Sequence, residues 1–466
     1  MKKQIVLFIF VSFSINVVVH AQNNSLTLKE AIFIGINNNP GIKAANQVVE
    51  SCSHNASAAK GRYLPRIDVV GLANKIDKSI SLNFNDIRTA IISADVATYK
   101  FLGGRTPDSL QQELNKNIPS FEKKVLNDTF VRVMATFIQP VFTGFKVSAN
   151  ASVKKLEKEV AEINLQLTKN SVISSIIEDY YRVKLIEQVV QIRKDYLEDI
   201  EKHVDNAKRL YSSGVISKAN YLRAEVALSE AQRDYKQALA DKDLILILLS
   251  NNIGRDIKDM VLSSDMAMLQ TLKSVDYYES KAEANNGSLK LLDSRKQMLK
   301  QKHKVSVGNL LPNISLAGEY QILQNDLSII EPKWVVGAIA SLNIFGGASD
   351  INEIKAVKAQ INAIDSQSLD VKNIVRTGIK NFYHKCEAAK NDYEALQSSE
   401  ELAKENLKLY QTSFKEGLAT SLEVLDAELA FTKIKVDQAK AIFDYNSAYA
   451  NLLNICSILQ EEEFSQ

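Results

Sequence analysis

The chain has 466 residues, with 57 lysines and arginines against 55 aspartates and glutamates, giving a formal net charge of +2. This balance excludes the strong positive field on which nucleic-acid binding depends, so we expect no nucleic-acid partner. Hydrophobic residues make up 45% of the chain, which excludes an intrinsically disordered protein. Residues 141–311 and 333–466 contain no proline. Because proline removes a backbone donor and clashes with the preceding turn, its absence predicts long uninterrupted helices there.

The first 21 residues have the pattern of a secretory signal peptide. Two lysines are followed by an apolar stretch over residues 5–19 and by the small-residue cleavage site Val19-His20-Ala21. An anchoring helix is the alternative, but it needs about 20 apolar residues, and polar residues such as Ser12 and Ser14 dilute this stretch. We therefore expect the mature protein to begin near Gln22.

Membrane strands are predicted at 64–74 and 129–139, and more clearly at 313–322 and 334–344. Apolar and polar residues alternate in these segments, which is typical of a membrane-spanning strand of about ten residues. A soluble hairpin packed on the helices is the alternative. Residues 75–128 join the first two strands and are rich in polar residues, so we expect them to form an extracellular loop. This loop either restricts the outer mouth or forms a variable surface.

Long helices are predicted after each pair of strands. From Lys146 to Ser213 the apolar residues recur at steps of three and four, as in a coiled coil, and the same stripe recurs from Ile379 to Phe414. The 68 positions of the first helix would extend roughly 100 Å, far more than the width of a compact domain. Each helix ends at a glycine-containing tip, at 212–220 and 415–426, and a second helix returns from it.

The two halves of the chain repeat each other. Asn39-Pro40-Gly41-Ile42-Lys43 aligns with Asn286-Gly287-Ser288-Leu289-Lys290 at an offset of 247, whereas Phe142-Thr143-Gly144 aligns with Phe345-Gly346-Gly347 at an offset of 203. The difference places 44 additional residues within the first half, between its two strands. We expect a first structural repeat over 22–250, a connector or equatorial segment over 251–285, and a second structural repeat over 286–460.

In this order, the motifs resemble the TolC family of bacterial outer-membrane efflux proteins. The landmarks are Leu26-Thr27-Leu28-Lys29-Glu30-Ala31, Asn38-Asn39-Pro40, the strand openings Leu64-Pro65 and Leu311-Pro312, the two Phe-x-Gly motifs above, Gly214-Val215-Ile216-Ser217 and Gly417-Leu418-Ala419-Thr420. The resemblance implies a mainly α chain with membrane β-structure. Three chains would share a twelve-stranded transmembrane β-barrel, continued across the periplasm by a long antiparallel helical coiled-coil barrel. Four strands are too few to close a barrel, which independently favours several chains.

The resemblance also implies roles for particular residues. Leu422-Glu423-Val424-Leu425-Asp426-Ala427 is similar to the family's pore-entrance motif, so three copies of Glu423 and Asp426 would form acidic rings that favour cations. Alternatively, Thr420-Ser421-Leu422-Glu423 is a capping box in which Glu423 serves the helix start. The tips, where the family docks periplasmic adaptor proteins, correspond to Tyr211, Gly214, Val215, Ser217, Phe414, Gly417, Leu418 and Thr420. Tyr320 and Trp334 are predicted at the membrane interface.

One departure from the family concerns closure of the entrance. In the best-known members of the family, an acid in the first turn and a basic residue in the second help to lock the entrance, but the matching positions here hold Asn220 and Ala419. We hypothesise that closure uses other pairs, formed by Arg209, Lys218 or Arg223 with Glu423, Asp426 or Glu428.

No catalytic pattern emerges from the sequence. The five histidines are dispersed, and neither a metal-ligand spacing, a phosphate-binding glycine loop nor a nucleophile motif is present, so we expect neither an enzyme nor a cofactor. The expected function is that of a homotrimeric outer-membrane duct in a tripartite efflux system. It would let small molecules pass and would be driven by an inner-membrane pump through a periplasmic adaptor (membrane fusion) protein. A type I protein secretion duct is the near alternative, and a secreted fibrous coiled-coil or adhesion protein is the alternative from another class.

Overall fold

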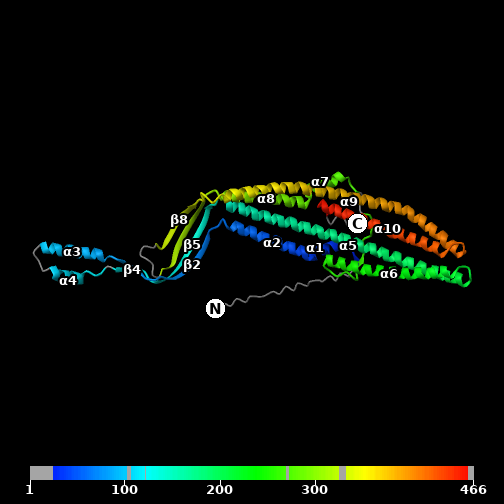
Figure 1. Cartoon of the computed structure of the whole chain (residues 1–466), viewed down its shortest axis with the longest axis horizontal. Helices are drawn as coiled ribbons and strands as arrows, with labels where there is room; N and C mark the ends of the chain where they lie inside the picture. Colours follow the sequence, from blue (N-terminus) through cyan, green and yellow to red (C-terminus); the bar gives the residue numbers. More distant parts are fainter. Residues whose placement is uncertain (1–24, 102–106, 121, 269–271, 325–331, 460–466) are drawn as a thin grey trace, which may run out of the picture. The chain divides into compact units, whose positions relative to one another are not determined.

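The computed structural model describes residues 25–101, 107–120, 122–268, 272–324 and 332–459 and is mainly helical with antiparallel strands (Figure 1). The predicted signal peptide lies outside the described residues. Among the described residues, no helix has the length and hydrophobicity needed to cross a membrane. The elements in chain order are β1 (Ser25–Leu26), α1 (Leu28–Asn38), α2 (Pro40–Gly61), β2 (Arg66–Lys75), β3 (Ile80–Asn83), α3 (Asn85–Phe101), α4 (Pro107–Asn117), β4 (Glu122–Leu126), β5 (Thr129–Phe142), α5 (Lys146–Ser212), α6 (Lys218–Ile253), β6 (Val261–Leu262), α7 (Val275–Asn285), α8 (Gly287–Gly308), β7 (Asn313–Gln324), β8 (Trp334–Ser341), α9 (Ser349–Lys415) and α10 (Ser421–Ile455).

The chain forms two compact units, and each unit draws on both sequence repeats. The helical unit comprises the described residues within 25–51, 159–295 and 364–459, whereas the strand unit comprises those within 52–158 and 296–363. The equivalent elements of the two repeats therefore pack together, strands with strands and helix pairs with helix pairs. The long helices α5 and α9 each have 67 residues, which matches the duplicated proline-free segments.

The strand unit contains a four-stranded antiparallel sheet in the order β2-β5-β7-β8. Strands β5 and β7 come from different repeats and pair at the centre, where the ring of Phe137 covers Gly318 on the partner strand. Strands β2 and β8 form the two edges, and every residue of β8 is exposed. In one chain, the sheet thus has two unpaired edges and exposed apolar side chains such as Val336 and Ile339.

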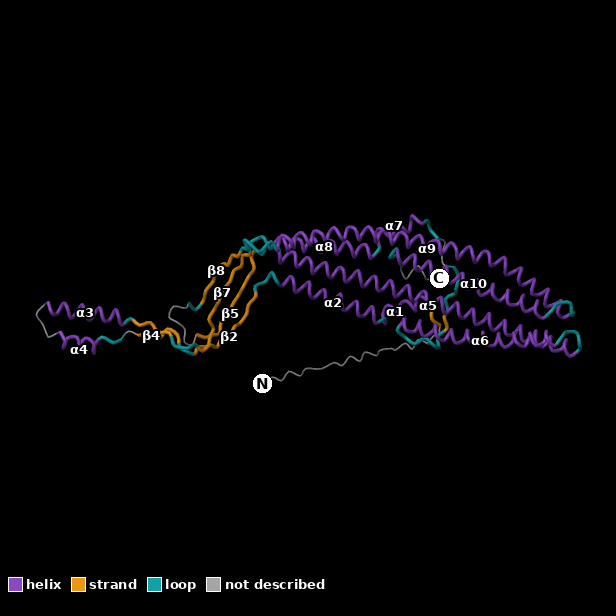
Figure 2. Tube along the Cα trace, in the orientation of Figure 1, coloured by secondary structure: helices purple, strands orange, loops and turns teal. Residues whose placement is uncertain are grey.

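We call residues 76–128 the insertion; its described residues form two strands and two helices, where the sequence suggested only a polar loop. Strands β3 and β4 form an antiparallel ribbon, and α3 and α4 pack against each other as a helical pair (Figure 2). Arg88 of α3 donates from Nε to the carbonyl oxygen of Ile118 at 2.9 Å and from Nη2 to that of Asn115 at 2.8 Å. Ile92 and Leu110 are buried. The buried side chains of Ile92 and Leu110 and the bonds of Arg88 therefore contribute to the packing of this helical pair.

The helical unit has its main core where β1 and α1 pack with parts of α5, α6, α7, α9 and α10. Strand β1 pairs in parallel with β6, and the hydroxyl of buried Tyr180 on α5 donates to the carbonyl oxygen of Leu26 at 2.8 Å. The same hydroxyl accepts from the backbone N–H of Ser264 at 3.0 Å. Cys386 and Cys456 are buried in this core as free thiols.

A close glycine pair in the strand unit gives a first prediction. Gly144 has φ +61°, and a Cβ on Gly308 would lie 2.2 Å from the carbonyl oxygen of Gly144. Since the obstacle is backbone, Gly308→Ala should destabilise the protein by about 1–3 kcal/mol. We expect a lower Tm for the detergent-purified protein. Gly71→Ala in β2 meets no atom within 4 Å and is the matched control; equal Tm values for the two variants would contradict the close approach.

Candidate functional site: the helical hairpin tips

The first tip, between α5 and α6, is closed by a glycine in the left-handed region. Gly214 has φ +74°, and the N–H of Val215 donates to the carbonyl oxygen of Leu210 at 2.9 Å. This bond ends α5 in a Schellman motif, for which a residue without a Cβ is favoured. The hydroxyl of Ser217 then accepts from the N–H of Asn220 at 3.4 Å and begins α6.

The second tip, between α9 and α10, repeats this geometry. Gly417 also has φ +74°, and the N–H of Leu418 donates to the carbonyl oxygen of Ser413 at 2.9 Å. The two tips lie against each other, since a Cβ built on Gly417 would be 3.0 Å from Cγ1 of Val215. The aligned Gly motifs of the sequence thus correspond to one repeated turn, and the two copies meet in space.

Glu423 forms the capping box that the sequence offered as one interpretation. The N–H and hydroxyl of Thr420 both donate to its Oε2, at 2.7 and 2.9 Å, and the N–H of Glu423 donates to Oγ1 of Thr420 at 3.3 Å. These bonds hold the pKa of the Glu423 carboxyl below its usual value. Glu423 is therefore ionised at neutral pH, and its side chain remains exposed.

Asp426 lies one turn further along α10 and is also exposed. Residues three apart lie on one face of a helix, so Glu423 and Asp426 share an exposed face, whereas Val424 and Ala427 are buried. Two carboxylates on one exposed face are suited to attracting cations. Their position at the pore entrance remains a prediction.

Some of the predicted docking residues form an exposed apolar rim at the tips. Leu418 is 79% exposed, Val215 is exposed, and Tyr211 is partly covered by a parallel stack with Tyr221, with ring centroids 5.6 Å apart. Exposed apolar groups gathered at a helix end are typical of an interaction surface. The returning helices add two exposed leucines, and we call the whole set the tip rim: Tyr211, Val215, Leu222, Leu418 and Leu422.

Phe414 requires a correction, because the sequence grouped it with the docking residues. It is only 1% exposed and packs in a small core between the hairpins with residues such as Ile200 and Val204. Its ring centroid lies 4.6 Å from that of His203. Phe414 continues the apolar stripe of α9, so its position on the stripe predicted burial better than its nearness to the turn did.

A buried polar cluster lies beside Phe414; the sequence named its member Glu428 only as a possible closing partner and did not predict its burial. Glu428 is 4% exposed, and its Oε2 accepts from Nε2 of Gln411 at 3.2 Å. Burial, with a smaller contribution from Asp199, raises the pKa of Glu428 to about 7, against the opposing effects of Gln411, Lys202 and Lys435. The signal was present, because Leu425, Glu428 and Thr432 are spaced three and four apart on the buried stripe.

His203 on α5 belongs to the same cluster. Its Nε2 lies 2.7 Å from the hydroxyl oxygen of Ser421, and burial lowers the pKa of His203 to about 4. The ring is therefore neutral at physiological pH and its bond to Ser421 joins α5 to the first residue of α10. Together with Glu428, it lines a small cavity of about 230 Å³.

The hypothesised closing pairs are not formed at Glu428. Its charged neighbours are Asp199, Lys202 and Lys435, while Arg209 donates to the side chain of Asn206 within α5. Arg209 is thus held on its own helix.

Tyr320 and Trp334, predicted at the membrane interface, are directly paired across β7 and β8 and both are exposed. Nζ of Lys333 lies 5.7 Å from the centroid of the Tyr320 ring. An aromatic pair beside a cation is the composition of an interfacial girdle, and this role remains a prediction.

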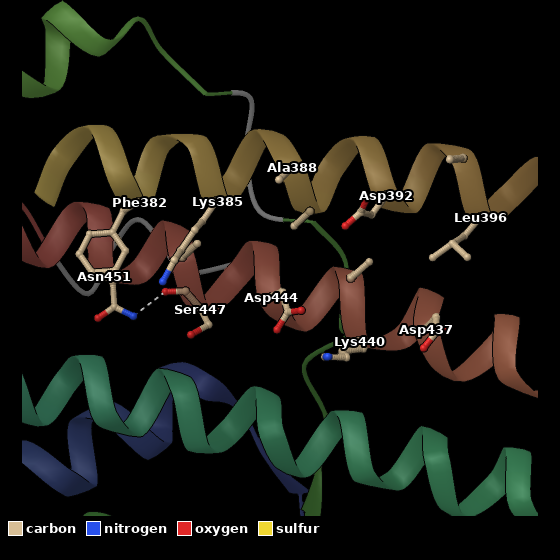
Figure 3. A pocket seen from close by; sticks show the side chains of 14 residues that line it. Phe382, Lys385, Ala388, Asp392, Leu396, Asp437, Lys440, Asp444, Ser447 and Asn451 are labelled. Atoms are coloured by element: carbon tan, nitrogen blue, oxygen red, sulfur yellow. Dashed lines mark hydrogen bonds between the residues drawn. The ribbon is translucent and has the colours of Figure 1, made fainter. Parts of the chain in front are cut away.

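A charged groove of about 730 Å³ runs between α9 and α10 away from the tips (Figure 3). Lys385 and Asp392 of α9 line it with Asp437, Lys440 and Asp444 of α10. Burial raises the pKa of Asp444, and Lys440 opposes this effect. Within the described ranges, no cluster of histidine, cysteine and acidic side chains is arranged to hold a metal ion.

Known proteins resemble this chain along most of its length. The family described as Outer membrane efflux protein matches residues 35–255 and 279–456. Nodulation protein T of Rhizobium leguminosarum bv. trifolii is 20% identical over 312 residues, which cover 64% of this chain and 65% of that protein, slightly less than two thirds of its length.

Solved structures show the same fold. The outer membrane protein VceC of Vibrio cholerae superposes with a TM-score of 0.71 and 13% identity, covering 92% of this chain and 96% of that one. The CmeC outer membrane channel of Campylobacter jejuni superposes with a TM-score of 0.73 and 14% identity, covering 94% and 89%. At such identities the likeness establishes the architecture.

Burial of Glu428 predicts a pH-dependent stability. The pKa is 4.5 in the unfolded chain and about 7 in the fold, so the folded state holds the proton more tightly. Stability therefore falls as pH rises from 4.5 to 7 and stays reduced above 7, by on the order of 3 kcal/mol. We expect Glu428→Gln to raise Tm clearly at pH 8 and much less at pH 5.

The contribution of His203 to stability has the opposite pH dependence. Because His203 is present in both proteins, this contribution cancels when their Tm values are compared. Asp205→Asn, which removes an exposed carboxylate of α5, is the control. A Glu428→Gln effect that is the same at pH 5 and pH 8 would contradict a raised pKa.

The positions of Phe414 and Leu418 predict opposite responses to truncation. Phe414→Ala should leave a cavity in the tip core and cost about 3–5 kcal/mol, whereas Leu418→Ala at an exposed position should change stability by less than about 0.5 kcal/mol. Tm measurements on the purified variants check this. Similar losses in both would mean that Leu418 also packs in a core.

Proposed function

The chain belongs to the outer membrane efflux protein family, a family of outer-membrane channels and not of enzymes, and we propose that three copies form the exit duct of a tripartite efflux system. In this proposal the duct supplies no energy. A periplasmic adaptor joins it to an inner-membrane pump, which selects the small molecules that pass.

The open-edged sheet is the observation that carries the proposal. Strands β2 and β8 have unpaired edges, and β8 is exposed along its whole length. In hydrocarbon, no water satisfies unpaired N–H and C=O groups, so the sheet needs further strands on both sides. Pairing β8 of one copy with β2 of the next satisfies both edges, and three copies give a closed barrel of twelve strands. A fibrous adhesion protein offers no explanation for this sheet.

The tip rim is the proposed docking surface for the adaptor. It exposes Leu418 and Val215 at the ends of both hairpins, and the Schellman turns hold these side chains outward. An apolar rim at the end of a rigid helical pair suits association with another helical hairpin, because burial of apolar area supplies the main favourable free energy. A type I secretion duct would use the same surface with a different pump.

Glu423 and Asp426 are the proposed acidic rings. Both are exposed on one face of α10 directly after the tip. Three copies related by a rotation axis would bring six carboxylates around the entrance, and such rings attract cations. Glu423 then has two roles, since its capping bonds leave the carboxylate charged.

The oligomeric state and the ion current of the full chain test this proposal. The full chain, extracted from outer membranes in detergent, should migrate as a trimer unheated and as a monomer after boiling. In planar bilayers the trimer should conduct and prefer cations, and Asp426→Asn should lower that preference several-fold, with Asp205→Asn as the matched control. If the full chain were found as a soluble monomer, the proposed duct would be contradicted. A conducting trimer whose cation selectivity is unchanged in Asp426→Asn would overturn only the acidic ring.

A further inference from the structure

Helix α3 of the insertion has an exposed apolar seam that its own hairpin does not use. Phe84, just before the helix, is followed at steps of three and four by Ile87, Ile91, Ala94 and Thr98. Phe84, Ile87 and Ile91 are 44%, 59% and 47% exposed. The spacing is that of a heptad seam, and none of its residues is charged.

The other side of α3 already has a partner. Arg88 bonds to the carbonyl oxygens at and after the end of α4, and Ile92 is buried beside it, so this face belongs to the hairpin. A helix with two apolar stripes needs neighbours on two sides. Ile87 and Ile91 lie on the second stripe, and about half of each side chain is exposed in a single chain.

The connection to the sheet indicates what covers the second stripe. Strand β3 begins at Ile80, five residues after the edge strand β2 ends at Lys75, which limits the tether to less than about 20 Å. The return tether is shorter still, and the N–H of Ile76 donates to the carbonyl oxygen of Asp128 at 2.7 Å. Three copies that share one barrel would therefore hold their insertions at the same rim of that barrel. Each insertion would then be at a high effective concentration relative to the other two.

Charge and side-chain shape favour self-association of the insertion. Residues 76–128 contain 7 basic and 7 acidic residues, so copies of the insertion do not repel each other. Isoleucine at successive seam positions favours bundles of three or four helices over pairs. Copies related by a rotation axis run parallel to one another, as such a bundle requires. Exposed Asp86 and Asp95 on the same helix disfavour an anionic lipid surface as the occupant.

We infer that α3 packs through Phe84, Ile87 and Ile91 against α3 of two further copies, forming a parallel three-helix bundle on the channel's symmetry axis. This inference rests on the proposed trimer. The helix has 17 residues, about 25 Å, which is short for an independent coiled coil, so the bundle depends on the tethers to the barrel.

Cysteine crosslinking in the full chain tests the bundle. In purified trimer, Ile91→Cys should give a covalent dimer on mild oxidation, with at most two of the three chains joined, because a disulfide links only two thiols. Ser93→Cys lies exposed on another side of the same helix and should stay monomeric after boiling. Cys386 and Cys456 are buried and do not compete, and the half-buried Cys52 is replaced in both variants by Cys52→Ser.

A second variant gives an independent readout. Ile91→Asp places three carboxylates in the proposed seam, which should open the bundle while the barrel keeps the trimer together. Trypsin should then cut the insertion at least tenfold faster than in the wild type, and Ser93→Asp should leave the rate unchanged.

The outcomes separate the two proposals. A particle that is not trimeric refutes the duct and, with it, the bundle. A trimer in which the Ile91→Cys variant stays uncrosslinked, or in which Ile91→Asp leaves proteolysis unchanged, refutes the bundle alone. Binding of the uncrosslinked trimer's insertion to vesicles would identify a lipid surface as the occupant instead.

Discussion

Unpaired backbone groups at the two edges of the sheet β2-β5-β7-β8 are the constraint on which the rest of the proposed assembly depends. Each chain provides four strands, and a sheet in hydrocarbon cannot leave N–H and C=O groups unsatisfied. The duplicated chain pairs its two strand hairpins through β5 and β7, and this leaves one edge from each repeat for neighbours. In the proposed assembly, hydrogen bonding to other copies satisfies both edges, and a tube is the arrangement that achieves this.

The duplication explains why the two tips are alike and also why they differ. Both use a left-handed glycine and the same backbone bond from the residue after it. Only the second has the full capping box, because Glu423 occupies the place that Asn220 has in the first. At the tips, the acidic helix start and the acid three residues further are therefore present in α10, where α6 has Asn220 and Arg223. One ancestral turn has become two surfaces with different electrostatic properties.

The buried cluster of His203, Ser421 and Glu428 sets the tip apart from an ordinary coiled-coil end. A seam filled with leucines would hold α5, α9 and α10 together more strongly, since an ionised buried carboxylate lowers stability. Glu428 instead has a pKa near neutral pH and a cavity beside it. The hairpins are consequently joined by apolar contacts around Phe414 and by the bond between His203 and Ser421, beside a carboxyl whose charge changes near neutral pH.

The sequence by itself determined the order, type and approximate length of the main elements, because these depend on local periodicity, proline position and the repeat. Glu423 in its capping box and the glycine turns were predictable for the same reason, as each involves residues within one turn. The structure decided the rest: that Phe414 and Glu428 are buried between hairpins, that the insertion folds into a ribbon and a helical pair, and that Tyr320 faces Trp334. These features depend on contacts between residues far apart in the chain, and one sequence with its local patterns does not specify which stripe meets which neighbour.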